Sequence, residues 1–188
     1  SMNKHYFIAI KIPKELAAAI IQERDKTNLH RTHKILPVAE DLHITLYYLG
    51  HVADGILQQI IHSLNRLEWE SFELKTSGVA HFGNEATPRV VYTSLEKSDS
   101  LQLLQQKIVQ LLSNFIEVQK TNDFTAHITM AKKWASLELL NLTEFNLSDV
   151  VFDVLSFSIF TVNVNRSPRY EEICTVKWRR GENNGPTS

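Results

Sequence analysis

Cysteine, long apolar runs and an excess of charge of either sign are all scarce in this sequence. Cys174 is the only cysteine among the 188 residues, so the chain can form no intrachain disulfide and no cysteine-rich zinc site. A lone cysteine in the segment EEICTVKW is expected to pack as a small buried hydrophobe. A chain without disulfides suits a reducing compartment, and we therefore expect a cytoplasmic protein.

No apolar run approaches the ~20 residues that a helix needs to cross a bilayer. The first residues, SMNKHYFIAIKIP, contain one strand-length apolar run and no small-residue cleavage site, so we expect neither a signal peptide nor membrane association. The formal charge is −1, which argues against a broad electrostatic contact with long nucleic acid. It leaves room for a small pocket that binds one phosphate or the end of a strand.

Apolar periodicity predicts an alternation of short strands and amphipathic helices. Strands are predicted from alternating or continuous apolar residues at 5–12, 42–49, 71–83, 89–95, 126–134, 150–164 and 170–178. Helices are predicted from apolar residues three and four apart at 13–28, 54–69 and 98–116. The polar segment 29–41 is expected to be a solvated loop that holds a short strand. Because many strands follow one another directly, the order favours antiparallel pairing and an α+β fold.

Two of the predicted strands open with the same pattern, His-Ile-Thr followed by an apolar residue. LHITLYYLG places His43 beside Thr45, and AHITMAKK places His127 beside Thr129. Since alternate residues of a strand share a face, each strand presents an imidazole next to a hydroxyl and buries the intervening isoleucine.

A random sequence of this composition would contain about 0.6 His-x-Thr triplets. The alternative to a paired functional site is therefore that the two strand histidines are unrelated. A third copy, His30-Arg31-Thr32, lies in a charged stretch without apolar backing. We expect it to be part of the solvated loop, together with His33, and to have no role in catalysis.

The two strand patterns suit displacement at a phosphodiester. Imidazoles exchange protons near neutral pH, so His43 and His127 would act as a general acid and base. Hydroxyls donate hydrogen bonds to anionic oxygens, so Thr45 and Thr129 would hold the phosphoryl group. This chemistry needs no metal or other cofactor, and we expect none.

The segments HITLYYLG and HITMAKK resemble the paired signatures of the two-histidine (2H) phosphoesterases, in particular the bacterial LigT/ThpR-type RNA 2′,3′-cyclic phosphodiesterases. YFIAIKIP, HFGNEATPRVVYTSL and DVLSFSIFTVNVNRSPRYEEI resemble further segments of the same family, so the resemblance spans about Tyr6 to Trp178. It implies a bilobed α+β fold, with two antiparallel sheets, helices on the outside and a cleft between the lobes. We expect one such domain over residues 2–180 and a disordered tail over 181–188.

The resemblance also implies a reaction, the opening of a 2′,3′-cyclic phosphate at the end of RNA or an oligonucleotide to leave a 2′-phosphate. His43 and His127 would be the catalytic pair, and Thr45 and Thr129 would hold the phosphate. From the resemblance we assign His127 as the base for the attacking water and His43 as the acid toward the 3′ oxygen.

The family carries an aromatic residue after the first motif and often a basic residue after the second, which are Tyr48 and Lys132 here. Both are expected to contact the nucleotide. Strict alternation points them away from the histidine face, so each needs a bulge or a strand end to reach the cleft. Lys132 stands where the family commonly has arginine, and a lysine cannot make the bidentate phosphate contact.

Two other functions fit the same motifs. A 2H enzyme acting on a small substrate, such as a 2′,5′-linked oligonucleotide or a cyclic-phosphate metabolite, is equally compatible with the low net charge. A catalytically silent nucleotide-binding module is disfavoured because both His-x-Thr pairs are intact. The sequence has no adenylation-type lysine motif, so any ligase activity is expected to be minor. The expected partners are RNA or oligonucleotide ends, and no obligate protein partner is inferred.

Overall fold

The computed structural model describes residues 4–119 and 124–180, so the predicted tail lies outside the described part of the chain. The described strands are β1 (His5–Lys11), β2 (His33–Ile35), β3 (His43–His51), β4 (Phe72–Gly83), β5 (Pro88–Leu95), β6 (His127–Trp134), β7 (Val151–Val154), β8 (Ser156–Val162) and β9 (Tyr170–Lys177). The helices are α1 (Lys14–Lys26), α2 (Asp54–Asn65) and α3 (Asp99–Leu112), with 3-10 turns η1 (Leu29–Arg31), η2 (Ala39–Asp41) and η3 (Leu142–Glu144). Apart from their ends, the three helices agree with those predicted.

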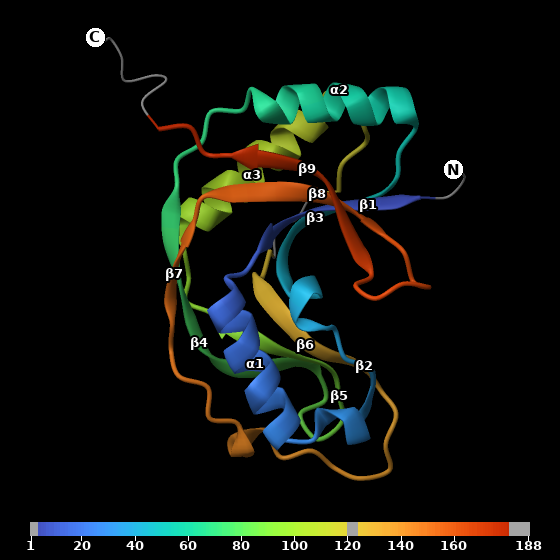
Figure 1. The fold of residues 1–188 in the computed structure, drawn as a ribbon, viewed down its shortest axis with the longest axis vertical. Helices are drawn as coiled ribbons and strands as arrows, with labels where there is room; N and C mark the ends of the chain where they lie inside the picture. Colours follow the sequence, from blue (N-terminus) through green and yellow to red (C-terminus); the bar gives the residue numbers. More distant parts are fainter. Residues whose placement is uncertain (1–3, 120–123, 181–188) are drawn as a thin grey trace.

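The strands pair antiparallel along one path, β7-β4-β5-β6-β3-β1-β8-β9, and β2 pairs with β6 beside β3. Strand pairing is sparsest at the middle of this path, where β3 and β6 pair through the single residue pair Ile44–Ile128. One antiparallel set therefore continues from β3 and another from β6, and they form the upper and lower halves of the molecule in Figure 1. The predicted α+β class is confirmed, and the two predicted antiparallel sheets are the two halves of one continuous antiparallel sheet.

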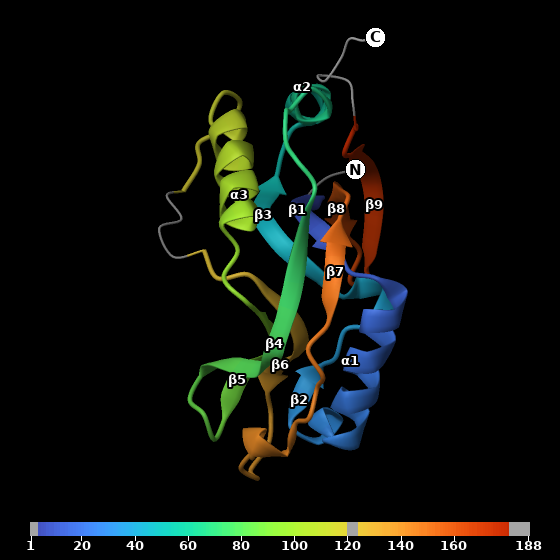
Figure 2. The same cartoon turned by 90° about the vertical axis from the view of Figure 1, so that its left-hand side faces the viewer.

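Each half of the sheet is covered by a helix that directly follows a strand of the other half. Helix α1 follows β1 of the upper half yet contacts β6, and α3 follows β5 of the lower half yet contacts β3. Figures 1 and 2 show α1 beside the lower strands and α3 beside the upper ones. We refer to this arrangement as the helix exchange. Helix α2 packs on α3 and β9. None of the described helices combines the length and the apolar content needed to cross a membrane.

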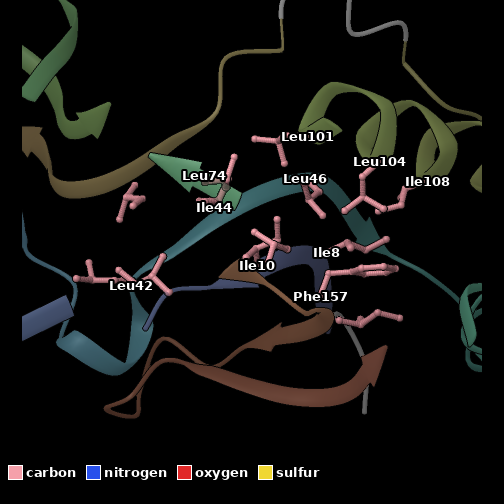
Figure 3. Packing of buried hydrophobic residues seen from close by; sticks show 14 of the residues in the cluster. Ile8, Ile10, Leu42, Ile44, Leu46, Leu74, Leu101, Leu104, Ile108 and Phe157 are labelled. Carbon is pink, nitrogen blue, oxygen red and sulfur yellow. The ribbon is translucent and has the colours of Figure 1, made fainter. Parts of the chain in front are cut away.

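The core of the upper half lies between α3 and the strands. The Ser98 side chain caps α3 by accepting a hydrogen bond from the backbone N–H of Leu101 at 3.1 Å, as expected for a serine at this position. Leu101, Leu104 and Ile108 then face β3, where they meet the side chain of Leu46 (Figure 3). Further core side chains from neighbouring strands complete this cluster: Ile8, Ile10, Ile44 and Phe157.

The prediction of one strand over residues 150–164 was wrong, because the segment forms two strands. β7 pairs with β4 in one half, and β8 pairs with β1 in the other. Leu155 stands between them, 53% exposed, and its carbonyl accepts a hydrogen bond from the backbone N–H of Trp178 at 2.8 Å. The chain therefore changes partner strands at Leu155 while its apolar sequence continues.

The short strand predicted within residues 29–41 is β2, but the prediction that His33 is solvated was wrong. The imidazole of His33 is 3% exposed, with its ring nitrogens 2.8 Å from the Thr32 hydroxyl and 2.8 Å from the Pro88 carbonyl oxygen. The ring packs edge-on against Trp134, because β2 pairs with the end of β6 and the ladder brings the two side chains together. His30 is exposed, as expected.

Candidate active site

The two His-x-Thr strands, β3 and β6, are neighbours in the sheet, and their pairing brings the four predicted residues together. With Ile44 opposite Ile128, an antiparallel register places His43 across from Thr129 and Thr45 across from His127. Residues directly opposite have Cβ atoms ~4.5–5.5 Å apart and share a face. The two isoleucines are fully buried on the other face, so both imidazoles and both hydroxyls belong to one surface.

Both imidazoles are oriented by the same backbone contact. Nδ1–H of His43 donates to the carbonyl oxygen of Asp41 at 2.6 Å, and Nδ1–H of His127 donates to that of Thr125 at 2.9 Å. A carbonyl can only accept, so the proton of the neutral ring is assigned to Nδ1. Nε2 is therefore the atom left to exchange protons. In His43 it lies 3.0 Å from the hydroxyl of Thr45.

Two aromatic rings contact each imidazole. The ring of His43 lies 5.0 Å from that of Phe7 and 5.1 Å from that of Tyr170, which it meets edge-on. The ring of His127 lies 5.0 Å from that of Phe82 and 5.2 Å from that of Tyr92. These four aromatic residues were not predicted, because only strand pairing brings them to the motifs. Packing against two rings limits rotation of each imidazole.

A β-bulge follows the motif threonine in both strands. Pairing of β3 with β1 passes over Leu46, and pairing of β6 with β5 passes over Met130. An extra residue in one strand shifts the alternation of side chains beyond it. As a result, Tyr48 and Lys132 lie on the histidine face and line a cavity with His43. Strict alternation would have pointed both residues away from the histidine face. The bulges bring them to the cleft, as predicted.

Buried polar side chains from two helices bind the two bulges. Nε2 of Gln105 on α3 donates to the carbonyl oxygen of Leu46 at 3.3 Å, and Nη1 of Arg24 on α1 donates to that of Met130 at 3.1 Å. Gln105 is 2% exposed and Arg24 is 7% exposed. A bulge residue has no partner directly opposite, so its buried carbonyl needs another donor. Nothing in the sequence pattern indicates this role, because both residues occupy ordinary polar positions of amphipathic helices.

The candidate catalytic cavity has a volume of about 400 Å³ and is lined from both halves of the sheet. Its lining includes His43, Thr45, Thr129, Lys132 and Arg169, whereas His127 is not among the lining residues and lies next to it across the strand pair. Burial lowers the pKa of Lys132, and the positive charges of Arg169 and Lys133 lower it further. Several cations therefore lie close together at this cavity, an arrangement that favours an anionic ligand.

Asp41 links the loop between β8 and β9 to His43. Its buried carboxylate accepts hydrogen bonds from the backbone N–H groups of Arg169 at 2.8 Å and Tyr170 at 3.2 Å. Its own carbonyl oxygen accepts from His43. One residue thus positions the imidazole of His43, the ring of Tyr170 beside it and the backbone of Arg169, although neither Asp41 nor Arg169 was predicted from the sequence.

The environment of His43 disfavours its charged form. Burial lowers its pKa below the usual 6.5, and the nearby charges of Lys132 and His127 act in the same direction. The carbonyl and the carboxylate of Asp41 oppose this shift without reversing it. His43 is therefore neutral at pH 7 and can accept a proton at Nε2.

The model of the 2′-5′ RNA ligase superfamily matches residues 12–161. An RNA 2′,3′-cyclic phosphodiesterase of Bacillus subtilis (strain 168) is 30% identical over 177 residues, which cover 92% of this chain and 95% of that protein. A Thermus thermophilus protein of the same name is 31% identical over 137 residues, covering 69% of this chain and 68% of that protein. The crystal structure of E. coli LigT complexed with 3′-AMP has the same fold, with a TM-score of 0.76 at 21% identity over 95% of this chain and 99% of that one. The chain thus belongs to the 2′-5′ RNA ligase superfamily, whose members are 2H phosphoesterases.

Proposed function

We propose that this protein hydrolyses a 2′,3′-cyclic phosphate at the end of RNA or an oligonucleotide and leaves a 2′-phosphate. The observation that carries the proposal is the convergence of two imidazoles and two hydroxyls on one face of the paired strands β3 and β6. The names of the relatives from Bacillus subtilis and Thermus thermophilus support the same activity.

The phosphate would lie over the four motif residues. The hydroxyls of Thr45 and Thr129 would donate hydrogen bonds to its non-bridging oxygens, and Lys132 and Arg169 would balance the negative charge. Charge on these oxygens grows as water adds to phosphorus, so donors fixed in place stabilise the transition state more than the ground state.

We assign the base to His43 and the acid to His127, which exchanges the roles expected from the resemblance. His43 is neutral before substrate binds, because burial and Lys132 lower its pKa, so Nε2 can take the proton from the attacking water. His127 would give a proton to the 3′ oxygen as the bond between phosphorus and that oxygen breaks. The products are a 2′-phosphomonoester and a free 3′-hydroxyl, and each imidazole ends with the proton state that the other began with.

A second candidate is hydrolysis of a small cyclic phosphate or a 2′,5′-linked oligonucleotide by the same four residues. The cavity volume of about 400 Å³ favours it, because sites for single small ligands fall in the range ~300–1,000 Å³.

The deciding experiment uses a short RNA that ends in a 2′,3′-cyclic phosphate, with EDTA present and the product ends resolved as 2′- or 3′-phosphate. The wild-type protein should open the ring to a 2′-phosphate, and chelation should leave the rate unchanged. His43→Ala and His127→Ala should each lower kcat by ~10²–10⁴-fold, the usual contribution of general acid–base catalysis. His30→Ala is the matched control, since this exposed histidine belongs to the third His-x-Thr copy.

Near-wild-type turnover by either catalytic variant would contradict the two-histidine mechanism. If folded wild-type protein fails to turn over the RNA but opens a nucleoside 2′,3′-cyclic monophosphate, the second candidate replaces the first.

A further inference from the structure

A larger cavity adjoins the candidate catalytic cavity along the loop between β8 and β9, residues 163–169. It has a volume of about 900 Å³, and its lining includes Lys4 and His5 at the start of β1. We call it the outer groove. Figure 1 shows the loop projecting beyond the sheet near the start of β1. The two cavities share these lining residues: Tyr48, Val162, Val164, Arg169 and Tyr170. The outer groove is therefore continuous with the site of the proposed reaction.

The charge of the outer groove favours an anionic chain. Lys4, Arg166 and Arg169 line it, against one carboxylate, that of Glu171. The ion pairs found among the described residues involve other side chains, so these three cations have no carboxylate partner within the described chain. Uncompensated lysines and arginines along a groove are the usual means of binding a phosphate backbone without reading its sequence.

Two rings stand where the outer groove meets the catalytic cavity. Tyr48 is 57% exposed, and its hydroxyl lies 2.7 Å from Nδ1 of His5. The ring centroids are 6.2 Å apart, so the hydrogen bond holds the two side chains together at the boundary. Exposed aromatic rings beside a basic groove serve as stacking platforms for single-stranded bases.

We propose that the outer groove binds the nucleotides on the 5′ side of the cyclic phosphate, so that the protein prefers an oligonucleotide to a nucleoside cyclic phosphate. This inference rests on the proposed function. A cyclic phosphate closes the 3′ end of a strand, so the rest of the strand must leave the catalytic cavity from its 5′ side. The outer groove offers that exit with cations for the next phosphates and a ring pair for the next base.

A second cavity beside the same loop also adjoins the candidate catalytic cavity and offers another exit for the strand. That cavity has a volume of about 400 Å³ and is lined by Lys34 and Pro37. Its described lining residues include no exposed aromatic ring, and its volume is less than half that of the outer groove. We therefore assign the strand to the outer groove, and Lys34 provides a matched control for Lys4.

The test compares kcat/KM for a nucleoside 2′,3′-cyclic monophosphate with that for a trinucleotide ending in the same cyclic nucleotide. The wild-type protein should favour the trinucleotide by ~10-fold or more, since stacking of one base alone is worth ~5–150-fold. For Lys4→Ala, kcat/KM of the trinucleotide should fall several-fold, and its dependence on log[salt] should lose a slope of about one. The mononucleotide should be unaffected, and Lys34→Ala should behave as wild type with both substrates.

The outcomes separate this inference from the proposed function. Turnover of the mononucleotide with no advantage for the trinucleotide would overturn the outer groove alone. A loss confined to Lys34→Ala would overturn it as well, because the strand would then take the other exit. Turnover of neither substrate would overturn the proposed function and this inference with it.

Discussion

Gln105 tests whether the bulge of β3 positions the active site. Its Nε2 donates to the carbonyl oxygen of Leu46, the bulge residue next to Thr45. In Gln105→Met, a side chain of similar length and volume fills the same buried space, so little cavity forms. What the variant removes is the donor.

Two magnitudes follow from this contact. A buried carbonyl left without a partner costs ~1–3 kcal/mol of unfolding free energy. The bulge also decides whether Tyr48 lies on the same face as Thr45. Since a shift of ~1 Å in a positioning group can cost ~10²-fold in rate, we expect kcat/KM for a nucleoside 2′,3′-cyclic monophosphate to fall by ~10–100-fold.

Stability would be measured by urea unfolding, and kcat/KM at a temperature where the variant is fully folded. Gln106→Met is the matched control, because Gln106 is the neighbouring residue of α3 and is exposed. An exposed substitution of this kind changes stability by no more than ~0.5 kcal/mol. If Gln105→Met loses stability but retains wild-type kcat/KM, the hydrogen bond supports the fold without positioning the site. If it matches Gln106→Met in both measurements, the reasoning is refuted.

Two further predictions concern protonation. Burial lowers the pKa of both His33 and His43 below 6.5. Below about pH 6.5 the unfolded chain therefore binds more protons than the folded one. The unfolding free energy should then fall as the pH drops from about 6.5 toward the folded pKa values. His33→Asn should lose part of that slope, measured by urea unfolding between about pH 7.5 and pH 5, and a slope equal to that of wild type would contradict a role for His33. If His127 is the acid, replacing the 3′ bridging oxygen of the substrate by sulfur should restore most turnover to His127→Ala. A thiol has a pKa of about 8.5, so its thiolate can leave without being protonated. The same substrate should not rescue His43→Ala, and rescue of that variant instead would return the acid role to His43.

The sequence was sufficient for the parts of the fold that depend on local periodicity. A period of two placed His43 with Thr45 and His127 with Thr129, and the structure keeps each pair on one face of its strand. The strand break at Leu155 was not predictable, because the apolar pattern VVFDVLSFSIF runs through it without interruption. The break exists only because the two strands on either side pair with different partners.

The residues that support the site could not be predicted from the sequence for a different reason. Asp41 and Arg169 are 128 positions apart in the chain, and only the folded sheet brings them into contact. Gln105 and Gln106 are the same residue type side by side, and which of them is buried depends on where α3 meets β3. His33 is buried because β2 pairs with the end of β6, a contact that its polar neighbours in sequence do not suggest.

The helix exchange makes the two halves of the molecule inseparable. If the upper strands were expressed as a fragment of their own, β3 would lose the cover of α3, and the lower strands alone would leave β6 without α1. Each fragment would expose an apolar surface that its partner normally covers, so neither half is a self-sufficient folding unit. Loss of structure in one half removes the support of the motif strand in the other, and the two imidazoles lose their arrangement in the same cooperative transition. A species that retains half of the candidate site is therefore not expected to accumulate during unfolding.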